Sequence, residues 1–354
     1  MLKLRNQEAI KTTLKSFFKK DLNLLIFFVT SKCNLRCKYC FNAENLSSGE
    51  NDLEFSEVKK MITRLPSSIR SILFSGGEPC LRKDLEKIIG LFVNRGITDF
   101  AIPSNGVATK LILETLKKIA RKYPQTSLVA CTSIDPLKLA HDHLRGPGAY
   151  QKAIRTAKGI VHLSQKRKNI IPLVNSVVAK ESVPFLNQFI RLVYQEIKPK
   201  LHTLDIVRTN PKNENDFSKF SDQDYIKIKN ARMSIDKLYR GNDLLYSFYK
   251  KRSLILTDIQ KKIIKENHSW PVRCAAGRTS AVVYSSGEVA FCENHKPMDN
   301  LRKHDYDLSK ILNKHKEKYL QMTKKHKCDC NHLVYLRQAV EYNFPIVWLN
   351  SLFK

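Results

Sequence analysis

The sequence predicts an α/β fold, and three observations support this prediction. Apolar runs with the character of β-strands alternate with helical patterns over residues 22–208. Alternation of this kind produces right-handed strand–helix units with parallel strands. Several of these strands end in small polar residues or cysteines, and parallel barrels carry their functional groups on the loops that follow the strands.

Strands and helices are expected to follow one another in turn along this region. The strands occupy residues 22–30, 70–75, 98–103, 127–134, 170–178 and 202–208. The helices occupy residues 56–65, 82–94, 109–122, 149–165 and 185–196. The helix at 82–94 shows the pattern clearly, because its apolar side chains recur at the spacing of one helical face. These side chains are Leu85, Ile88, Ile89 and Phe92.

The chain is strongly basic, with 62 Lys and Arg against 33 Asp and Glu and a formal net charge of +29. The lysines are spread along the whole chain, which indicates a generally basic surface; attraction of a nucleic acid, an anionic membrane or an acidic substrate is the alternative. Nucleic acid is possible but not favoured, because no RNA-binding motif or zinc-finger spacing is present. The longest apolar run, residues 24–29, is far shorter than the ~18 residues of a membrane helix. No secretory signal is visible, so we expect a cytoplasmic protein.

The nine cysteines do not indicate a disulfide framework. Their number is odd and most fall into two groups, which is typical of metal binding or of a reducing compartment. Cys33, Cys37 and Cys40 form the first group, with the spacing C-x3-C-x2-C directly after the first predicted strand. Soft thiolate ligands select an iron–sulfur cluster, zinc or copper(I). A [4Fe–4S] cluster with three cysteine ligands leaves one iron open for chemistry, whereas a structural zinc normally takes four protein ligands.

This spacing, with Tyr39 before the third cysteine, resembles the radical S-adenosylmethionine (SAM) enzymes. The resemblance implies a partial (β/α)6 TIM-like radical SAM barrel with a [4Fe–4S] cluster on Cys33, Cys37 and Cys40. SAM would bind at the open iron. A zinc knuckle or three unrelated core cysteines are the alternatives that the residues leave open.

Two later strand ends agree with this family in order and interval. Gly76-Gly77-Glu78-Pro79 follows the second strand and resembles the family motif whose backbone and acidic side chain hold the amino group of the bound methionine. Ser104 and Asn105 end the third strand and resemble the segment that reaches the ribose and the carboxylate.

The fourth and fifth strands continue the resemblance. Ser133 and Asp135 end the fourth strand in the same manner, and Val177 lies in a strand similar to the one whose backbone meets the adenine. Arg145 follows in a stretch that resembles one whose arginine pairs with the methionine carboxylate; the alternative is a surface arginine in a loop. Two further cysteines, Cys80 and Cys131, lack ligand spacing and are expected to be small buried residues.

A second cysteine group lies in the C-terminal part: Cys274, Cys292, Cys328 and Cys330. Two apolar runs, 281–284 and 288–291, flank a glycine turn and predict a β-hairpin. The pattern of Cys274, Gly287 and Cys292 resembles the opening of the SPASM and twitch extensions of radical SAM enzymes, which carry extra [4Fe–4S] clusters. Four cysteines suffice for one such auxiliary cluster and favour a twitch-like form. Zinc is the competing metal. Three histidines could contribute ligands to it, although we expect them to be structural or surface residues: His295, His326 and His332.

The predicted organisation has five parts. They are an N-terminal helix or arm (1–21), the barrel (22–208), a linker and helical segment (209–268), an auxiliary-cluster domain (269–333) and a C-terminal tail (334–354).

The resemblance implies an enzyme that cleaves SAM reductively to a 5′-deoxyadenosyl radical and abstracts a hydrogen atom from a small-molecule substrate. We expect a net oxidation assisted by the auxiliary cluster, with a flavodoxin- or ferredoxin-like electron donor; the sequence identifies no catalytic base. A peptide-modifying radical SAM/SPASM maturase is the alternative. Only 32 residues precede Cys33, too few for a leader-binding domain, so a maturase would require a separate partner. A second alternative is a non-catalytic, cluster-bearing protein that binds an acidic polymer or a membrane.

Overall fold

A computed structural model describes residues 21–208, 219–240, 246–265, 274–324 and 330–342. Its centre is one nine-stranded sheet with the order β6-β5-β4-β3-β2-β1-β7-β8-β9. The strands are β1 (Leu24–Thr30), β2 (Ser71–Gly76), β3 (Asp99–Ser104), β4 (Ser127–Ser133), β5 (Ile170–Val178), β6 (Leu201–Ile206), β7 (Ser280–Val283), β8 (Glu288–Ala290) and β9 (Asp299–Asn300). Strands β1 to β6 pair in parallel with their neighbours. The predicted α/β class and partial parallel barrel are therefore confirmed.

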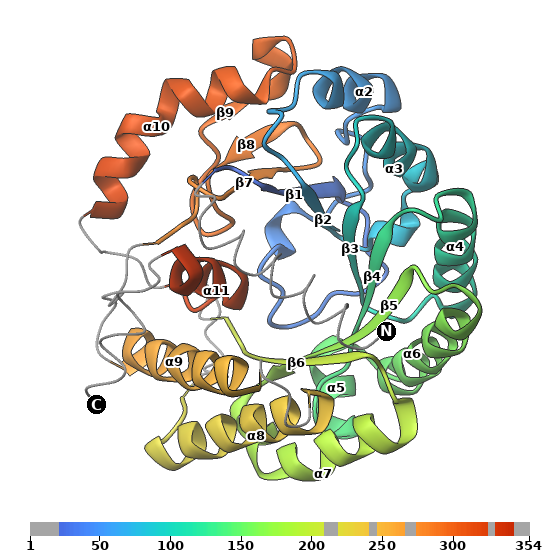
Figure 1. Cartoon of the computed structure of the whole chain (residues 1–354), viewed down its shortest axis with the longest axis vertical. Coiled ribbons are helices and arrows are strands. Elements are labelled where there is room, and N and C mark those ends of the chain that lie inside the picture. Colours follow the sequence, from blue (N-terminus) through green and yellow to red (C-terminus); the bar gives the residue numbers. More distant parts are fainter. Residues whose placement is uncertain (1–20, 209–218, 241–245, 266–273, 325–329, 343–354) are drawn as a thin grey trace.

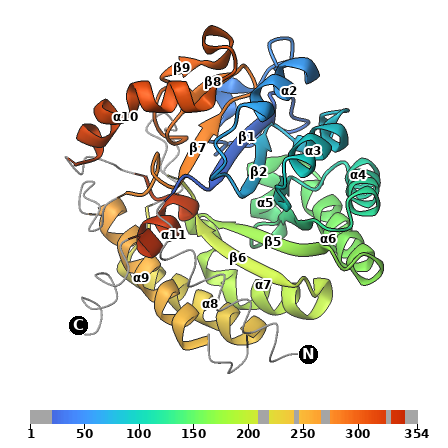
Figure 2. The same ribbon diagram turned by 45° about the horizontal axis from the view of Figure 1, so that its top comes forward.

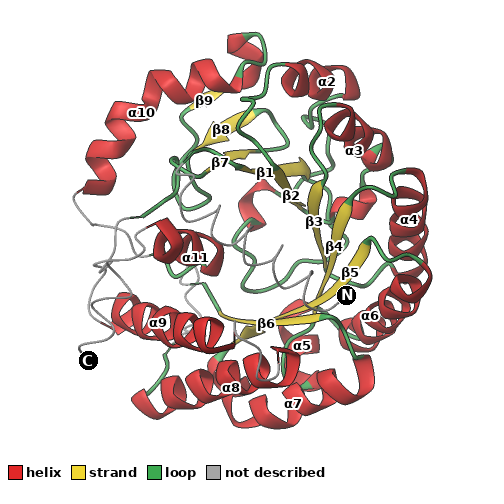
Figure 3. Cartoon of the chain, viewed as in Figure 1, coloured by secondary structure: helices red, strands yellow, loops and turns green. Residues whose placement is uncertain are grey.

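Helices surround this barrel, and all but α11 form its outer layer (Figures 1 and 3). They are α2 (Phe55–Thr63), α3 (Leu85–Asn94), α4 (Thr109–Lys122), α5 (Lys138–Arg145), α6 (Ala149–Lys166), α7 (Leu186–Leu192), α8 (Asp222–Arg240), α9 (Tyr246–Lys265), α10 (Leu308–Lys324) and α11 (Leu333–Tyr342). A π-helical segment, Val193–Ile197, extends α7. The sequence did not predict α5, because eight residues give too few turns for a recognisable period.

The apolar pattern of each strand matches its place in the sheet. β1 lies between β2 and β7, and its residues 25–30 are all buried, as expected for a strand covered on both faces. In β5 and β6 burial alternates strictly. Val174, Val178, Leu204 and Ile206 pack on the helical layer. Their partly exposed neighbours therefore face the inside of the barrel.

The C-terminal strands extend the same sheet. β7 pairs in parallel with β1, and β8 and β9 follow as antiparallel strands. The turn at Ser285–Gly287 joins β7 and β8, so the predicted hairpin is confirmed. On the outside, the Arg302 guanidinium donates to both Glu57 carboxylate oxygens at 2.7 and 3.0 Å, and this holds the pKa of Glu57 down to about 2. The C-terminal strands are thus anchored both to β1 and to α2.

Helix α11 begins at Leu333, the last residue of the predicted auxiliary-cluster domain, and continues into the segment predicted as a C-terminal tail. It lies between β6 and β7, on the open side of the barrel (Figures 1 and 2). The Asn331 side chain just before it donates to the Val207 carbonyl at 2.9 Å, and the Ser280 hydroxyl donates to Gln338 at 3.0 Å. Tyr335 and Leu336 are fully buried in the main core. The helix therefore fills the gap that six strands leave open.

No helix in the described ranges combines the length and the apolar character needed to cross a bilayer.

Candidate functional site

The first cysteine group lies on the loop that follows β1. Cys33, Cys37 and Cys40 are all free thiols of intermediate exposure. The loop is held to α5, because the Lys38 amide donates to the Leu144 carbonyl at 2.8 Å. The parallel strands end at this edge of the sheet, so the thiols meet the loops after β2, β3 and β4.

Burial and neighbouring charges set the protonation of these thiols. Burial raises the pKa of Cys37 to about 11, and it raises the pKa of Cys33 and of Cys40 as well. The positive charge of the Arg145 guanidinium acts against this rise in the pKa of Cys37 and of Cys40. Uncharged thiols are therefore the form at neutral pH without a ligand, and a bound cation would displace their protons.

Gly76 and Gly77 bring the end of β2 against the cysteine loop. The Gly77 amide donates to the Thr30 carbonyl at 2.8 Å, and the Glu78 amide donates to the Lys32 carbonyl at 2.7 Å. A Cβ on Gly77 would lie 2.0 Å from the Lys32 oxygen, and one on Gly76 would lie 2.2 Å from the Thr30 oxygen. The two glycines are thus required for contact between two backbones, next to Cys33.

Glu78 links this segment to the end of β3. Its carboxylate is fully buried and accepts hydrogen bonds from the Asn105 amide at 2.8 Å and the Ser104 hydroxyl at 3.1 Å. Burial raises the pKa of Glu78, and these donors partly offset the effect. The Asn105 side chain in turn lies 3.9 Å from the Cys33 sulfur. Pro79 begins a short 3-10 turn, Pro79–Leu81, after the carboxylate.

Asp135 is the centre of a second buried cluster, after β4. It accepts hydrogen bonds from the Tyr39 hydroxyl at 2.6 Å and the Val177 amide at 3.1 Å. The Arg145 fork donates to both of its oxygens, at 2.6 and 3.0 Å. Ser133 lies just before this cluster, in register with Asn175 of β5. Arg145, 8% exposed, is therefore not the surface loop residue of the alternative interpretation.

Replacing Arg145 with Met is expected to lower the free energy of unfolding by about 3–5 kcal/mol, because Asp135 would remain as an uncompensated buried charge. The change would appear in denaturant titrations of the purified protein. The double variant with Asp135→Asn should recover part of the loss. A double variant as unstable as Arg145→Met alone would contradict the ion-pair explanation.

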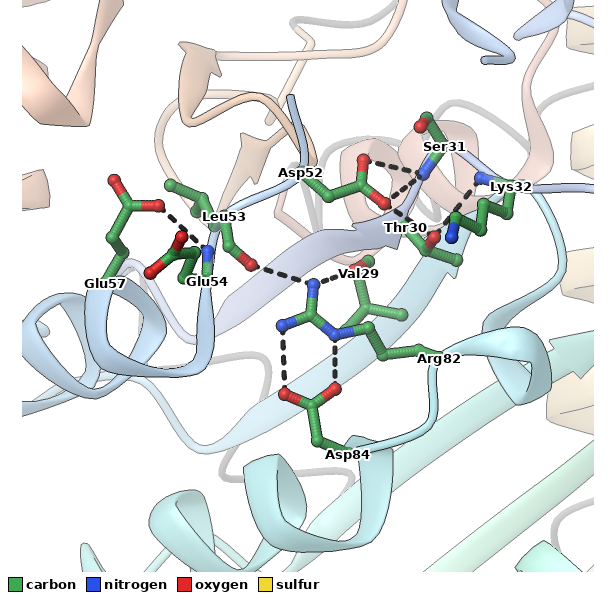
Figure 4. A network of polar contacts seen from close by, with 10 residues as sticks. All are labelled: Val29, Thr30, Ser31, Lys32, Asp52, Leu53, Glu54, Glu57, Arg82 and Asp84. Atoms are coloured by element: carbon green, nitrogen blue, oxygen red, sulfur yellow. Dashed lines mark hydrogen bonds and ion pairs between the residues drawn. The ribbon is translucent and has the colours of Figure 1, made fainter. Parts of the chain in front are cut away.

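A polar network holds the root of the cysteine loop (Figure 4). Asp52 accepts hydrogen bonds from the Thr30 hydroxyl at 2.7 Å and from the Ser31 amide at 3.0 Å. Arg82, paired with Asp84, donates to the Leu53 carbonyl at 2.8 Å. This network fixes residues 52–53 against the end of β1, just before Cys33.

Three of the four C-terminal cysteines lie in the described part of the chain. Cys274 is partly exposed, whereas Cys292 and Cys330 are buried. Cys292, Cys330 and Tyr335 belong to the same buried core, and the Glu293 amide, next to Cys292, donates to the Tyr335 hydroxyl at 3.1 Å. Cys328 and His326 lie outside the described residues. His295 packs against the Tyr319 ring.

An ionic cluster that the sequence analysis missed lies between the two cysteine groups. Arg208 follows β6 and pairs with Glu293 at 3.1 Å and with His332. The Arg208 guanidinium carbon lies 3.8 Å from the centre of the Phe41 ring. Glu293 is buried, and Arg208 and His332 lower its pKa to about 2. The sequence could have indicated this cluster only by position, because Phe41 directly follows Cys40, Glu293 directly follows Cys292, and Arg208 comes shortly after the end of a strand.

Within the described ranges, no three His, Cys, Asp or Glu side chains converge to hold a single metal ion. A cubane takes one cysteine per iron, so its ligands need not point at one atom. Cys80 is buried in the core, as predicted, whereas Cys131 on β4 is of intermediate exposure and not fully buried as expected.

Comparison with protein families matches residues 27–181 to the Radical SAM superfamily. Among curated proteins, the chain is similar to an Fe-coproporphyrin III synthase of Methanosarcina barkeri, with 27% identity over 202 residues, which are 54% of this chain and 49% of that protein. It is also similar to a probable GTP 3',8-cyclase of Methanococcus vannielii, with 32% identity over 116 residues, which are 32% of this chain and 39% of that protein. The chain thus spans half or less of the length of these relatives.

Two solved structures share the fold. One is anSMEcpe with bound AdoMet and Kp18Cys peptide, with a TM-score of 0.60 and 19% identity, covering 94% of this chain and 100% of that one. The other is SuiB of Streptococcus suis bound to the precursor peptide SuiA, with a TM-score of 0.56 and 15% identity, covering 86% and 69%.

Proposed function

Because residues 27–181 form a radical SAM domain, we propose that this chain binds SAM and a [4Fe–4S] cluster and acts as a radical SAM enzyme. Cys33, Cys37 and Cys40 would hold the cluster. One observation carries the proposal: the loop with three free thiols is hydrogen-bonded to the Gly76–Glu78 segment, at the carboxyl edge of a partial parallel barrel.

The donor set fits such a cluster. Three soft sulfur ligands leave one iron open, and the Arg145 guanidinium next to Cys37 and Cys40 suits the negative charge of a thiolate cluster. When bound, the cluster and SAM supply a 5′-deoxyadenosyl radical that removes a hydrogen atom from an unactivated carbon.

The residues of the chain would bind and orient SAM. Glu78, Ser104 and Asn105 form one polar edge for the methionine part, and the Asp135 cluster with Tyr39 and Val177 forms the other, toward the nucleoside. The Arg145 fork is turned to Asp135, so we propose that it acts mainly by fixing this carboxylate. The buried side chains around these groups would exclude water.

The test is anaerobic reconstitution with iron and sulfide, followed by SAM and a strong reductant. Formation of 5′-deoxyadenosine and methionine is expected. A filled cluster that produces no 5′-deoxyadenosine under any reducing condition would favour the non-catalytic alternative.

We propose further that Cys274, Cys292, Cys328 and Cys330 hold one auxiliary cluster. The burial of Cys292 and Cys330 in the same core supports this. Replacing Cys328 and Cys330 with Ala is expected to remove the second set of irons, roughly four, while uncoupled SAM cleavage continues. Metal analysis of the purified protein measures both. Unchanged iron together with a loss of zinc would contradict the proposal and favour a zinc site.

For the substrate, we propose a small polar molecule that undergoes net oxidation. The inner faces of β5 and β6 support this, because the Thr203 hydroxyl donates to Asn175 at 2.7 Å and Asp205 is partly exposed beside them. Both curated relatives named above carry names of small-molecule enzymes, an Fe-coproporphyrin III synthase and a GTP cyclase.

A peptide substrate is the second candidate, since both solved structures above contain a bound peptide. Comparing the stimulation of 5′-deoxyadenosine formation by GTP and by cysteine-containing peptides would discriminate the two classes. Stimulation by peptides alone would overturn the small-molecule proposal. We propose a flavodoxin- or ferredoxin-like electron donor.

A further inference from the structure

Arg208 contacts residues that are close in the sequence to cysteines of both groups. Its guanidinium carbon lies 3.8 Å from the centre of the Phe41 ring, and Phe41 directly follows Cys40. On its other side it pairs with Glu293, which directly follows Cys292. The same guanidinium also contacts His332, two residues beyond Cys330.

The charges of this cluster are poorly screened by solvent. The side chain of Glu293 is 3% exposed and that of Arg208 is 19% exposed. Charges act over longer distances in such surroundings than in water. A guanidinium does not lose its proton in proteins, and stacking on a ring fixes its plane. Arg208 therefore presents a permanent positive charge in one place.

An aromatic contact chain connects the same elements. Phe41 packs edge-on against Phe28 of β1 at 6.2 Å, and Phe28 packs against Tyr284, at the end of β7, at 4.8 Å. Burial raises the pKa of both Cys40 and Tyr284, and the positive charge of Arg208 acts against this rise in both. The cysteine loop and the C-terminal strands thus share one set of contacts.

We infer that Arg208 is a positioning residue that joins the two cysteine groups and raises the reduction potential of a cluster held by Cys33, Cys37 and Cys40. This inference rests on the proposed function. One-electron reduction adds a negative charge to the cluster, and a nearby positive charge stabilises the reduced form. Glu293 carries the opposite charge, so it holds Arg208 in place and partly offsets its effect.

Redox titration of the SAM-responsive paramagnetic signal in the reconstituted protein tests the inference. Arg208→Gln is expected to lower the midpoint potential, with about a tenfold change in the ratio of oxidised to reduced cluster at a fixed potential, equivalent to 59 mV for one electron. Glu293→Gln is expected to shift the potential upward. Arg208→Lys should retain most of the wild-type value.

Arg302→Gln is the matched control. Arg302 also pairs with a carboxylate, that of Glu57 on α2, and its loss should leave the potential unchanged. Iron content and circular dichroism verify that each variant is filled and folded.

The outcomes separate the two proposals. A wild-type protein without any SAM-responsive cluster signal contradicts the proposed function itself. A wild-type signal whose potential is the same in Arg208→Gln and Glu293→Gln overturns this inference alone, and so do shifts of the same sign in both variants. If Arg208→Gln assembles no cluster, Glu293→Gln decides, because an unchanged or lower potential there overturns the inference.

Discussion

Replacement of Cys33, Cys37 and Cys40 together by alanine is expected to abolish SAM cleavage and to remove about four irons from the reconstituted protein. The physical reason is that these three thiols share the loop after β1, which is hydrogen-bonded to the Gly76–Glu78 segment, whereas Cys80 and Cys131 lie on other elements. Cys80 lies in the short turn Pro79–Leu81 and Cys131 lies within β4, so neither is on that loop. Iron analysis and the yield of 5′-deoxyadenosine measure the two effects.

Cys80→Ala is the matched control for this triple variant. It removes a thiol outside the cysteine loop, so iron content should persist; SAM cleavage is not the readout of this control, because the Cys80 thiol is hydrogen-bonded to Glu78. Retained 5′-deoxyadenosine formation in the triple variant would contradict the assignment of the cluster. Loss of iron in both variants would indicate damage to the fold.

Gly77→Ala is expected to produce the second largest effect, although it adds only one methyl group. That methyl carbon would lie 2.0 Å from the Lys32 carbonyl oxygen, which is backbone and cannot turn aside. Overpacking typically costs about 1–3 kcal/mol. Here the strain would also separate the two amide–carbonyl contacts that hold Gly77 and Glu78 to the cysteine loop. We expect most of the iron incorporation and SAM cleavage to be lost.

Gly96→Ala controls for the general cost of removing a glycine. Gly96 has a φ of +81°, but a Cβ there meets nothing within 4 Å. The control therefore carries backbone strain of about 1–2 kcal/mol without a collision. It should lower thermal stability slightly and leave iron content unchanged. Equal iron in Gly77→Ala and wild type would contradict the close-contact explanation.

Much of the fold was predictable because its signals are local. Each parallel strand is a short apolar run, each helix repeats its apolar residues at helical spacing, and the structure has the strand 170–178 and the helix 109–122 at the predicted bounds. The family match over residues 27–181 agrees with the motif at Cys33, Cys37 and Cys40. Helix α11 and the short α5 escaped prediction, since α11 owes its place to the gap between β6 and β7.

The sequence by itself determined the order of strands and helices, the spacing of the thiols and the polar residues at the strand ends, because these depend on neighbours along the chain. Only the tertiary structure decided which distant groups meet. It turned the Arg145 fork to Asp135, placed Gly77 against Lys32, and brought Arg208 between Phe41 and Glu293. Such contacts join loops that are far apart in the chain. They form because buried charges and backbone polar groups need partners, and a local sequence pattern does not specify which distant residue supplies the partner.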